Sequence, residues 1–285
     1  MKVLVTGGAG MLGRDVVLAC ERRGSRAVAL AHTDLDITDG RAVDATVGGQ
    51  RPDVVVNCAA WTDVDGAEDH EAEATRVNSE AAGVVAAAAA EVGASILHPS
   101  SDYVFDGSKG SAYVESDPTG ALSAYGRSKL AGETAVAVAN PKHFVVRSSW
   151  LFGIAGRNFV ETMLELASRQ SEVLVVSDQV GCPTYTAHLA EAIAGLIEGE
   201  AYGIHHVAAS GSCSWFEFAQ EIFDQSGVEC RVMAATTEML GRKAPRPACS
   251  ALDSERPDAI RLPSWREGLT AYLSERESRP REEAA

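Results

Sequence analysis

The sequence is short of positive charge. Its 25 Lys and Arg residues face 40 Asp and Glu residues, which gives a formal net charge of −15 at pH 7. A chain this acidic repels phosphate backbones and anionic lipid surfaces, so we expect no nucleic acid partner and no membrane partner. A small anionic ligand is compatible with this charge, because backbone N–H groups and a few local Arg side chains can hold one.

Cysteine pairs and long apolar runs are also missing. The six cysteines are scattered without any C-x-x-C spacing, which argues against a zinc site and against a disulfide framework. The longest apolar run, residues 81–90, is mostly Ala and ends at Glu91, as in a closely packed helix of a soluble protein. Met1 and Lys2 lead directly into a strand, which is too short a start for a signal peptide. We therefore expect a cytoplasmic protein with no metal site.

Strand-like and helix-like segments alternate through the first half of the chain. The short β-branched runs are apolar on both faces, which is typical of buried parallel strands. This alternation predicts an α/β fold with a Rossmann-like, doubly wound parallel sheet. The expected strands are Val3–Thr6, Ala27–Ala31, Val54–Asn57, Ser95–His98 and Phe144–Arg147, and the expected helices are Leu12–Arg23, Gly40–Gly49, Glu68–Val92 and Ala124–Ala139.

The pattern loosens after about Trp150, and at roughly 150 residues per domain the length of 285 residues suits one large domain or two modest ones. We expect a dinucleotide-binding domain over residues 1–150, a smaller α/β substrate domain over residues 151–274, and a disordered charged tail over residues 275–285. The first boundary is soft, because later segments can return strands to the main sheet. These segments are the expected helices Asn158–Arg169, Ala187–Ile197, Ser214–Gln225 and Ser264–Ser274 and the expected strands Val173–Val176 and Ile204–Val207.

A glycine-rich turn joins the first strand to the first helix. Gly7, Gly10 and Gly13 follow Val3–Thr6 directly. A dinucleotide site needs a tight turn, a backbone without Cβ where the pyrophosphate approaches the helix N-terminus, and close packing of helix on strand. The position of this turn between a strand and a helix favours cofactor binding over a purely structural turn.

The end of the second strand bears on the choice of nicotinamide cofactor. An acidic residue at this point would bind the ribose 2′-hydroxyl of NAD. This chain has His32 and Thr33 there, and Asp34 and Asp36 follow later. The missing acid favours NADPH over NADH, and a loop that merely faces solvent is the competing interpretation.

Two further segments carry candidate catalytic groups. Tyr125 and Lys129 lie one helical turn apart, so a nearby ammonium can lower the phenol pKa from its usual value of about 10. The phenol can then give a proton to a carbonyl oxygen as hydride arrives. Ser101 lies at the end of the fourth strand, where its hydroxyl can bind the same oxygen, and the small residues Ala59 and Ala60 follow the third strand.

Together these features resemble the extended short-chain dehydrogenase/reductases and, within them, the dTDP-4-dehydrorhamnose reductase family. The resemblance runs from Met1 to about Leu273. The stretches that carry it most specifically are Leu35–Asp39, Pro52–Thr62, Ser100–Phe105, Tyr125–Glu133, Arg147–Trp150 and Asp178–Thr184.

The resemblance implies an oxidoreductase that reduces the C4 ketone of dTDP-6-deoxy-L-lyxo-4-hexulose to dTDP-L-rhamnose. Ser101 stands where Thr is more usual and matches the catalytic hydroxyl, while Tyr125 and Lys129 match the proton donor and its partner. The expected cofactor contacts are Gly7, Gly10, Met11, Leu12, Gly13, His32, Asp36, Ile37, Ala59, Ala60, Thr62, Tyr125 and Lys129, and the expected substrate contacts are Asp102, Tyr103, Trp150 and Arg246.

The substrate contacts fit a charged deoxysugar nucleotide. An aromatic surface at Trp150 suits the apolar side of the sugar, a carboxylate at Asp102 suits its hydroxyls, and Arg246 could hold the diphosphate. A core position for Trp150 and a plain surface charge for Arg246 are the competing interpretations. Some family members are bridged into dimers by Mg²⁺, but the full acidic cluster is not recognisable here. Mg²⁺ dependence and the choice between monomer and homodimer therefore stay open.

Other functions remain as alternatives. One is the reduction of a related dTDP-ketosugar in secondary metabolism. A sugar-nucleotide dehydratase or epimerase is disfavoured, because dehydratases carry Asp-Glu after the strand-four hydroxyl and here Tyr103 follows Asp102. A third alternative is a non-catalytic NADP-binding subunit that resembles the regulatory β subunit of methionine adenosyltransferase.

Overall fold

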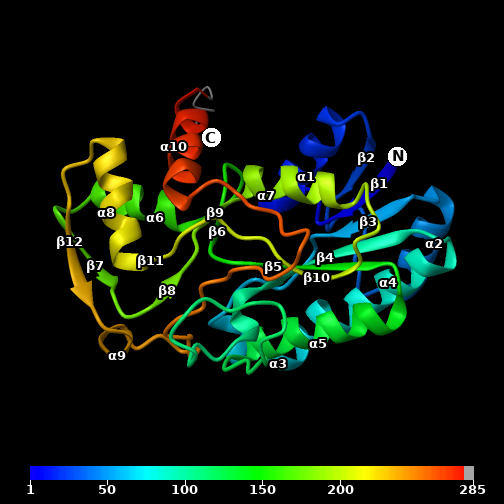
Figure 1. Ribbon diagram of the computed structural model, residues 1–285, viewed down its shortest axis with the longest axis horizontal. Helices are drawn as coiled ribbons and strands as arrows, with labels where there is room; N and C mark the ends of the chain where they lie inside the picture. Colours follow the sequence, from blue (N-terminus) through cyan, green and yellow to red (C-terminus); the bar gives the residue numbers. More distant parts are fainter. Residues whose placement is uncertain (279–285) are drawn as a thin grey trace.

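The computed structural model describes residues 1–278 (Figure 1). Its centre is a six-stranded sheet in the order β10-β5-β4-β3-β1-β2, in which all neighbours pair in parallel. The strand order changes direction between β1 and β3, as in a doubly wound sheet, which confirms the predicted fold class. The strands are β1 (Lys2–Thr6), β2 (Arg26–Leu30), β3 (Val54–Asn57), β4 (Ser95–Ser101), β5 (His143–Ser148) and β10 (Gly203–His206).

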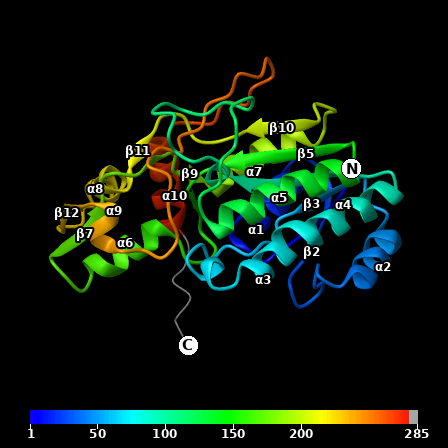
Figure 2. The ribbon, with the colours of Figure 1, turned by 90° about the horizontal axis from the view of Figure 1, so that it is seen from below.

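Helices cover both faces of this sheet because its strands are apolar on both sides. Val3 and Val5 pack in one core with α1 (Met11–Arg22) and α7 (Thr186–Leu196). Leu4, which points the other way, packs in a second core. Figure 2 shows the helices on that side, seen from below. They are α2 (Gly40–Gln50), α4 (Ala82–Glu91) and α5 (Ala124–Ala139).

A smaller lobe lies beside the sheet and has its own core, which includes Phe152, Phe218 and Trp265 (Figure 1). It is formed by segments from the second half of the chain. Two other segments from that half return to the first domain, because β10 is an edge strand of the main sheet and α7 packs on one of its faces. A single division of the chain at residue 150 therefore stays a prediction. The elements of the lobe are β6 (Leu151–Phe152), α6 (Phe159–Ala167), β7 (Glu172–Val176), β8 (Val180–Gly181), β9 (Thr184–Tyr185), β11 (Cys213–Ser214), α8 (Trp215–Ser226), β12 (Arg231–Ala235), α9 (Thr237–Leu240) and α10 (Trp265–Ser278).

The expected helix over residues 68–92 is interrupted. It consists of a 3-10 turn, η1 (Gly66–Glu68), a short helix, α3 (Glu71–Thr75), a π-helical segment, η2 (Arg76–Ala81), and α4. The π segment holds Asn78, whose amide binds the backbone of Trp61 rather than facing solvent. A π-bulge of this kind often marks a functional site.

The last helix is longer than expected. α10 continues to Ser278, so the first four residues of the expected disordered tail are helical. Two contacts hold them, because the Tyr185 hydroxyl donates to Glu275 and the Arg276 guanidinium binds Glu161. The rest of that tail, residues 279–285, lies outside the described residues. Within residues 1–278, no helix is long and apolar enough to cross a lipid bilayer.

Candidate active site

Four parallel strands end together at one edge of the sheet. Thr6 of β1 pairs with Asn57 of β3, and Ser101 of β4 pairs with Ser148 of β5. Ligands of doubly wound sheets bind at this edge, next to the point where the strand order reverses. The glycine turn and the loops that follow β3, β4 and β5 therefore meet where the sequence places its candidate site.

The backbone geometry of the turn after β1 requires glycine at two of its positions. Gly7 has a φ of 63°, and a Cβ on it would lie 2.6 Å from the Ala59 nitrogen. A Cβ on Gly13 would overlap the Gly7 carbonyl oxygen. Gly10 is different, because a Cβ there would meet only the Gly7 carbonyl oxygen, at 3.2 Å. Gly10 precedes α1, whose first turn has no side-chain cap and no acidic residue. This helix N-terminus fits an anion such as a pyrophosphate, and the glycine leaves room for it.

The turn after β2 presents few side chains to a cofactor. His32 is exposed, and Asp34 and Asp36 each accept a backbone N–H within the turn. The side chains of Ile37 and Leu12, by contrast, are buried in the core. Only the backbone at these two positions can therefore contact a ligand. Of the other expected contacts, Met11, Ala59 and Ala60 are half-buried and Thr62 is exposed.

The start of α5 packs directly on the turn after β4. Ser123 caps the helix by accepting the Gly126 N–H (3.1 Å), and a Cβ on Gly126 would overlap the Tyr103 carbonyl oxygen. This close approach places Tyr125 against the end of β4, where its ring meets that of Tyr103 edge-on at 5.9 Å and its hydroxyl lies close enough to Ser101 for that residue to lower the pKa of the phenol. Two of the three expected catalytic groups are thus in contact.

The third group, Lys129, is held in a different direction. Its amine donates to the carbonyl oxygen of Pro99 (2.7 Å) and lies 3.4 Å from Nε2 of His98. Burial raises the pKa of Tyr125 to about 12, although the hydrogen bond with Ser101 acts to lower it. The expected lowering of the Tyr125 pKa by Lys129 is therefore wrong for this structure. The phenol keeps its proton at neutral pH, as a proton donor must.

Lys129 is almost fully buried, and this burial lowers its pKa to about 8. The charge of Glu133 acts in the opposite direction. Glu133, one turn further along α5, forms a buried two-point ion pair with Arg147 (2.7 and 2.9 Å) and accepts the Ser100 hydroxyl. The carboxylate nearest to Lys129 in the sequence of α5 is therefore already paired.

Asn78 is a buried polar residue next to the candidate site that the sequence did not reveal. Its amide oxygen accepts the Trp61 N–H (2.8 Å), and its amide nitrogen donates to the Trp61 carbonyl oxygen (3.1 Å) and to the Ser128 hydroxyl (2.9 Å). It thereby fixes the loop after β3, with its expected cofactor contacts, to the helix that carries Tyr125 and Lys129. An interruption of helical periodicity around Asn78 is the only sequence signal for it, and the Ala-rich flanks hide that signal.

Asp102 is at the site, but its carboxylate is buried and occupied. It accepts hydroxyls from Ser101 (3.0 Å), Ser149 (3.2 Å) and Ser250. These three serines come from the ends of β4 and β5 and from the C-terminal loop. Burial raises the pKa of Asp102 to about 6, and the three hydrogen bonds oppose this shift. The structure thus gives Asp102 a role in joining three segments, in addition to any contact with a sugar.

Arg246 is also brought to the site, with a partner that the sequence did not indicate. Its guanidinium binds both carboxylate oxygens of Asp65 (2.9 and 3.0 Å) and donates to the Ala244 carbonyl oxygen (2.9 Å). The side chain of Arg246 is 15% exposed, so it is neither a plain surface charge nor an unpaired one. A diphosphate would have to share this guanidinium with Asp65.

Trp150 is half-buried and belongs to an aromatic cluster. Its ring stacks on Trp215 with centroids 3.6 Å apart and planes 5° apart, and Phe159 packs on Trp215 in turn. Trp150 has a φ of 48°, a left-handed conformation that costs about 1–2 kcal/mol in a residue with a Cβ. Any Cβ on Gly181 would overlap the indole. Little of the aromatic surface is therefore left for a sugar, which would meet mainly the edge of the ring.

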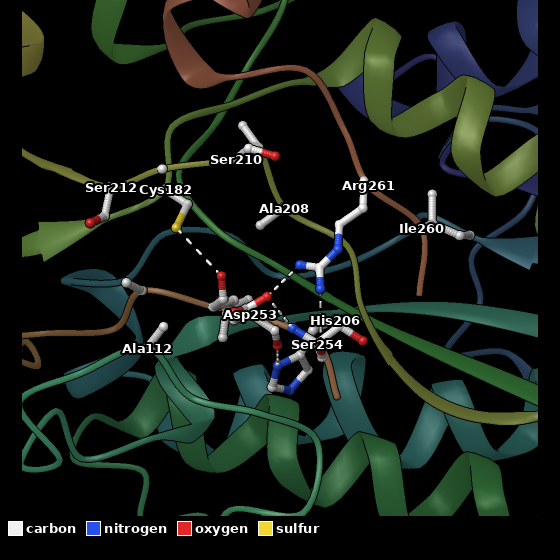
Figure 3. A pocket seen from close by; sticks show the side chains of 14 residues that line it. Ala112, Cys182, His206, Ala208, Ser210, Ser212, Asp253, Ser254, Ile260 and Arg261 are labelled. Carbon is white, nitrogen blue, oxygen red and sulfur yellow. Dashed lines mark hydrogen bonds and ion pairs between the residues drawn. The ribbon is translucent and has the colours of Figure 1, made fainter. Parts of the chain in front are cut away.

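A cavity of about 290 Å³ lies elsewhere, among β10 and the C-terminal loop (Figure 3). Its walls include Cys182, His206 and Arg261 but not Ser101, Tyr125 or Lys129. Its polar groups are already engaged, because Arg261 binds Asp253 and the His206 ring contacts backbone carbonyl oxygens. Across residues 1–278, no group of three His, Cys, Asp or Glu side chains is arranged to hold a metal ion.

A glycine turn at the switch point, a hydroxyl pair formed by Ser101 and Tyr125, and a buried lysine one turn further along the same helix are the arrangement of the short-chain dehydrogenase/reductases. The structure places this chain in that class of Rossmann-type proteins.

The comparison with known proteins narrows the class. The chain belongs to the family described as RmlD substrate binding domain, whose model matches residues 1–278. It is 46% identical to a dTDP-4-dehydrorhamnose reductase of Streptomyces griseus over 94% of this chain and 91% of that protein. A probable dTDP-4,6-dihydroxy-2-methyloxan-3-one 4-ketoreductase of Streptomyces antibioticus is 41% identical, with 94% and 93% covered.

A solved structure agrees with these matches. The dTDP-4-dehydrorhamnose reductase of Bacillus anthracis in complex with NADP superposes with a TM-score of 0.94 and 38% identity, over 96% of this chain and 99% of the other. The family resemblance seen in the sequence is thereby confirmed.

Proposed function

We propose that this protein is an NADPH-dependent reductase that converts the C4 ketone of dTDP-6-deoxy-L-lyxo-4-hexulose to the alcohol of dTDP-L-rhamnose. The observation that carries the proposal is that Ser101, Tyr125 and the buried Lys129 come together where β4 ends, in a chain of this family. The relatives named as dTDP-4-dehydrorhamnose reductases support the substrate class.

The residues of the site have distinct roles in this proposal. NADPH, when bound, supplies hydride to the ketone carbon. Tyr125, whose phenol is protonated at neutral pH, gives its proton to the ketone oxygen, so that one hydride and one proton make the alcohol. Ser101 hydrogen-bonds Tyr125 and can hold the same oxygen. Lys129, buried beside these groups, can hold the nicotinamide ribose.

The residues of the glycine turn fit a dinucleotide. Gly10 leaves space at the N-terminus of α1, where backbone N–H groups can bind the pyrophosphate. No acidic residue directly follows β2 in the sequence, and the carboxylate of Asp34 is engaged by the Ala31 N–H, which favours NADPH over NADH; the Bacillus anthracis relative holds NADP. The remaining expected contacts, His32, Asp36, Ala59, Ala60 and Thr62, are proposed to border the cofactor on the β2 and β3 sides.

The other expected contacts belong to the sugar nucleotide. We assign Asp102, Tyr103, Trp150 and Arg246 to its site, with the edge of Trp150 against the sugar and Arg246 near the diphosphate. The resemblance to the Streptomyces antibioticus protein supports a second candidate substrate, a related dTDP-ketosugar. The proposal places the reaction in the cytoplasm, with a monomer or homodimer as the working form, and light scattering of the purified protein decides between these two.

The test follows the absorbance of NADPH, then of NADH, while the ketosugar is made in place from dTDP-glucose by a 4,6-dehydratase and a 3,5-epimerase. Oxidation of NADPH that requires the epimerase supports the proposed substrate. Oxidation without the epimerase supports another ketosugar, and tight NADPH binding without any oxidation supports the non-catalytic regulatory alternative. Repeating the assay with EDTA measures any dependence on Mg²⁺.

A further inference from the structure

A chain of buried polar side chains runs from the first strand to Lys129. The Thr6 hydroxyl donates to the amide oxygen of Asn57 (2.6 Å), and the amide nitrogen of Asn57 lies 3.4 Å from Nδ1 of His98. Nε2 of the same ring lies 3.4 Å from Nζ of Lys129. All four side chains are at least 96% buried. The chain therefore crosses three neighbouring strands, β1, β3 and β4, and ends at the helix of Tyr125.

The ends of this chain determine where the imidazole carries its proton. The Asn57 amide oxygen is used by Thr6, so its amide nitrogen faces His98, and an amide nitrogen can only donate. Nδ1 of His98 must therefore accept. Burial, and next to it the charge of Lys129, hold the pKa of His98 well below its usual value, so the ring is neutral. A neutral ring that accepts at Nδ1 carries its proton at Nε2, which faces Lys129.

The Nε2–H group of His98 points at the amine of Lys129 and favours the neutral form of that amine. A neutral amine has a lone pair that can accept this proton in a hydrogen bond, whereas an ammonium would bring N–H against N–H. The other groups around Lys129 are the Pro99 carbonyl oxygen, which accepts at 2.7 Å, the paired carboxylate of Glu133, and the Cys58 thiol. Burial raises the pKa of that thiol to about 12, so the thiol is neutral.

The packing of α5 leaves the ring in place. Gly132 lies next to His98, since a Cβ on it would come within 3.3 Å of Nε2 and would overlap the Asn78 carbonyl oxygen. A side chain at position 132 would therefore push on the ring and on η2. The four side chains of this hydrogen-bonded row are therefore closely surrounded by protein atoms.

We propose that His98 is a positioning residue for Lys129. Held in a single tautomer by Asn57 and Thr6, it fixes the amine at the end of β4 and favours the form of Lys129 that has given up a proton. This inference rests on the proposed function, in which Lys129 belongs to the catalytic set.

The tautomer is tested directly in the protein without substrate. Nitrogen-15 NMR of protein labelled at His, with the His98 signals assigned by their loss in His98→Gln, should show a protonated Nε2 and a bare Nδ1 at every pH from 6 to 9. A proton on Nδ1, or titration of the ring within this range, would overturn the proposal. This readout does not depend on turnover, so a failure of the proposed function leaves it intact.

Two substitutions separate positioning from simple packing. The amide nitrogen of Gln at position 98 reaches to about where Nε2 lies, so His98→Gln can still donate to Lys129. The shorter Asn reaches only to about where Nδ1 lies, so His98→Asn keeps the contact with Asn57 and loses the one with Lys129. We expect His98→Asn to lower kcat roughly ten- to hundredfold with little change in KM for the sugar nucleotide, because a misplaced amine affects the reaction rather than binding. His98→Gln should recover most of this loss.

The pH dependence of kcat shows in which direction His98 shifts the pKa of Lys129. With Lys129 active as the ammonium, kcat falls as pH rises through the Lys129 pKa, which is about 8 in the free protein. Without the opposing N–H group, His98→Asn should move this alkaline limb upward by about one pH unit, a tenfold change in proton affinity. A limb that stays in place or moves downward would contradict the proposal, as would equal effects of Asn and Gln. Thermal unfolding and NADPH binding of both variants establish that they are folded.

Discussion

The two sides of the candidate site are built in different ways. On the cofactor side, glycines and the small residues after β3 bring backbone against backbone, as where Gly7 lies against Ala59. On the substrate side, polar side chains join segments far apart in the sequence, as in the ion pair between Asp65 and Arg246 and the contact between Asp102 and Ser250. A local motif therefore defines the first side, whereas the second exists only once the whole chain has folded.

The two sides also suit different kinds of ligand. The backbone on the cofactor side offers the same N–H groups whatever the side chains are, which suits a ligand shared by many reductases. The side chains on the substrate side can differ between relatives without changing the sheet, which suits a sugar that differs between them.

The largest expected effect is at Tyr125, where the two sides meet. Tyr125→Phe removes the hydroxyl that hydrogen-bonds Ser101 and keeps the ring against Tyr103. We expect kcat to fall by a factor of roughly 10²–10⁴, since this is what a positioned proton donor contributes. NADPH binding, measured by fluorescence titration, should stay within about twofold of the wild type. Unchanged turnover would remove Tyr125 from its role.

The cofactor side should respond to the loss of space. Gly10→Val adds a side chain whose Cβ would lie 3.2 Å from the Gly7 carbonyl oxygen, so the turn must shift by a few tenths of an ångström, and the added methyl groups would enter the space proposed for the pyrophosphate. Thermal unfolding checks that the variant is folded. We expect NADPH affinity to fall roughly 10- to 100-fold, which corresponds to the 1–3 kcal/mol typical of overpacking. The matched control is Gly48→Val on exposed α2, where nothing lies within 4 Å of the added Cβ. Equal affinities in both variants would mean that the anion site is elsewhere.

The substrate side should respond to pH through Asp102. Its folded-state pKa of about 6 exceeds the usual value of 3.8, so the folded protein binds an extra proton between these values and loses stability as pH rises through that window. Relative to Asp102→Asn, the wild type should lose about 1–3 kcal/mol between pH 4 and pH 7, measured by urea denaturation. Relative to Asp106→Asn, the wild type should show little change over this range, because hydrogen bonds from Ser108 and Tyr113 lower the pKa of Asp106, so that its contribution to stability changes only below about pH 4. Losses of equal size relative to both variants would contradict this assignment.

The smallest effect is expected at Arg246. Because Asp65 already partly neutralises the guanidinium of Arg246, this side chain would attract a diphosphate only weakly. Arg246→Gln should therefore raise KM for the sugar nucleotide by a factor of roughly ten or less. Arg261→Gln, which breaks an Arg–Asp pair outside the site, is the control and should leave KM unchanged. Steady-state kinetics of both variants measure the difference, and identical KM values would place Arg246 outside the substrate site.

The sequence predicted the central sheet well, because parallel buried strands and short connections leave local signals. The bounds of β3 and α5 are those expected, and β1 differs by one residue. The helix expected over residues 68–92 is wrong in its continuity, because it contains a π-helical segment, in which the side chain of Asn78 contacts Trp61 and Ser128. No local pattern encodes such contacts.

The sequence predicted that Ser101, Tyr125 and Lys129 would lie near one another, but it did not indicate their electrostatics. The pKa of Tyr125 rises because burial, which a motif does not show, outweighs the effect of neighbouring groups. Trp150 stacks on Trp215, which lies 65 positions later in the sequence. Arg246 pairs with Asp65, which lies 181 positions earlier. Contacts over such separations depend on the fold and cannot be read from spacing.

The most direct test of the central claim is the fate of a labelled hydride. NADPH with deuterium in both positions at C4 of the nicotinamide, used with the epimerised ketosugar, should give a product with deuterium at C4 of the sugar and the L-rhamno configuration by NMR. Tyr125→Phe should give almost none of this product over the same time. A product without deuterium, deuterium at another carbon, or the C4 epimer in place of rhamnose would contradict the proposed reaction.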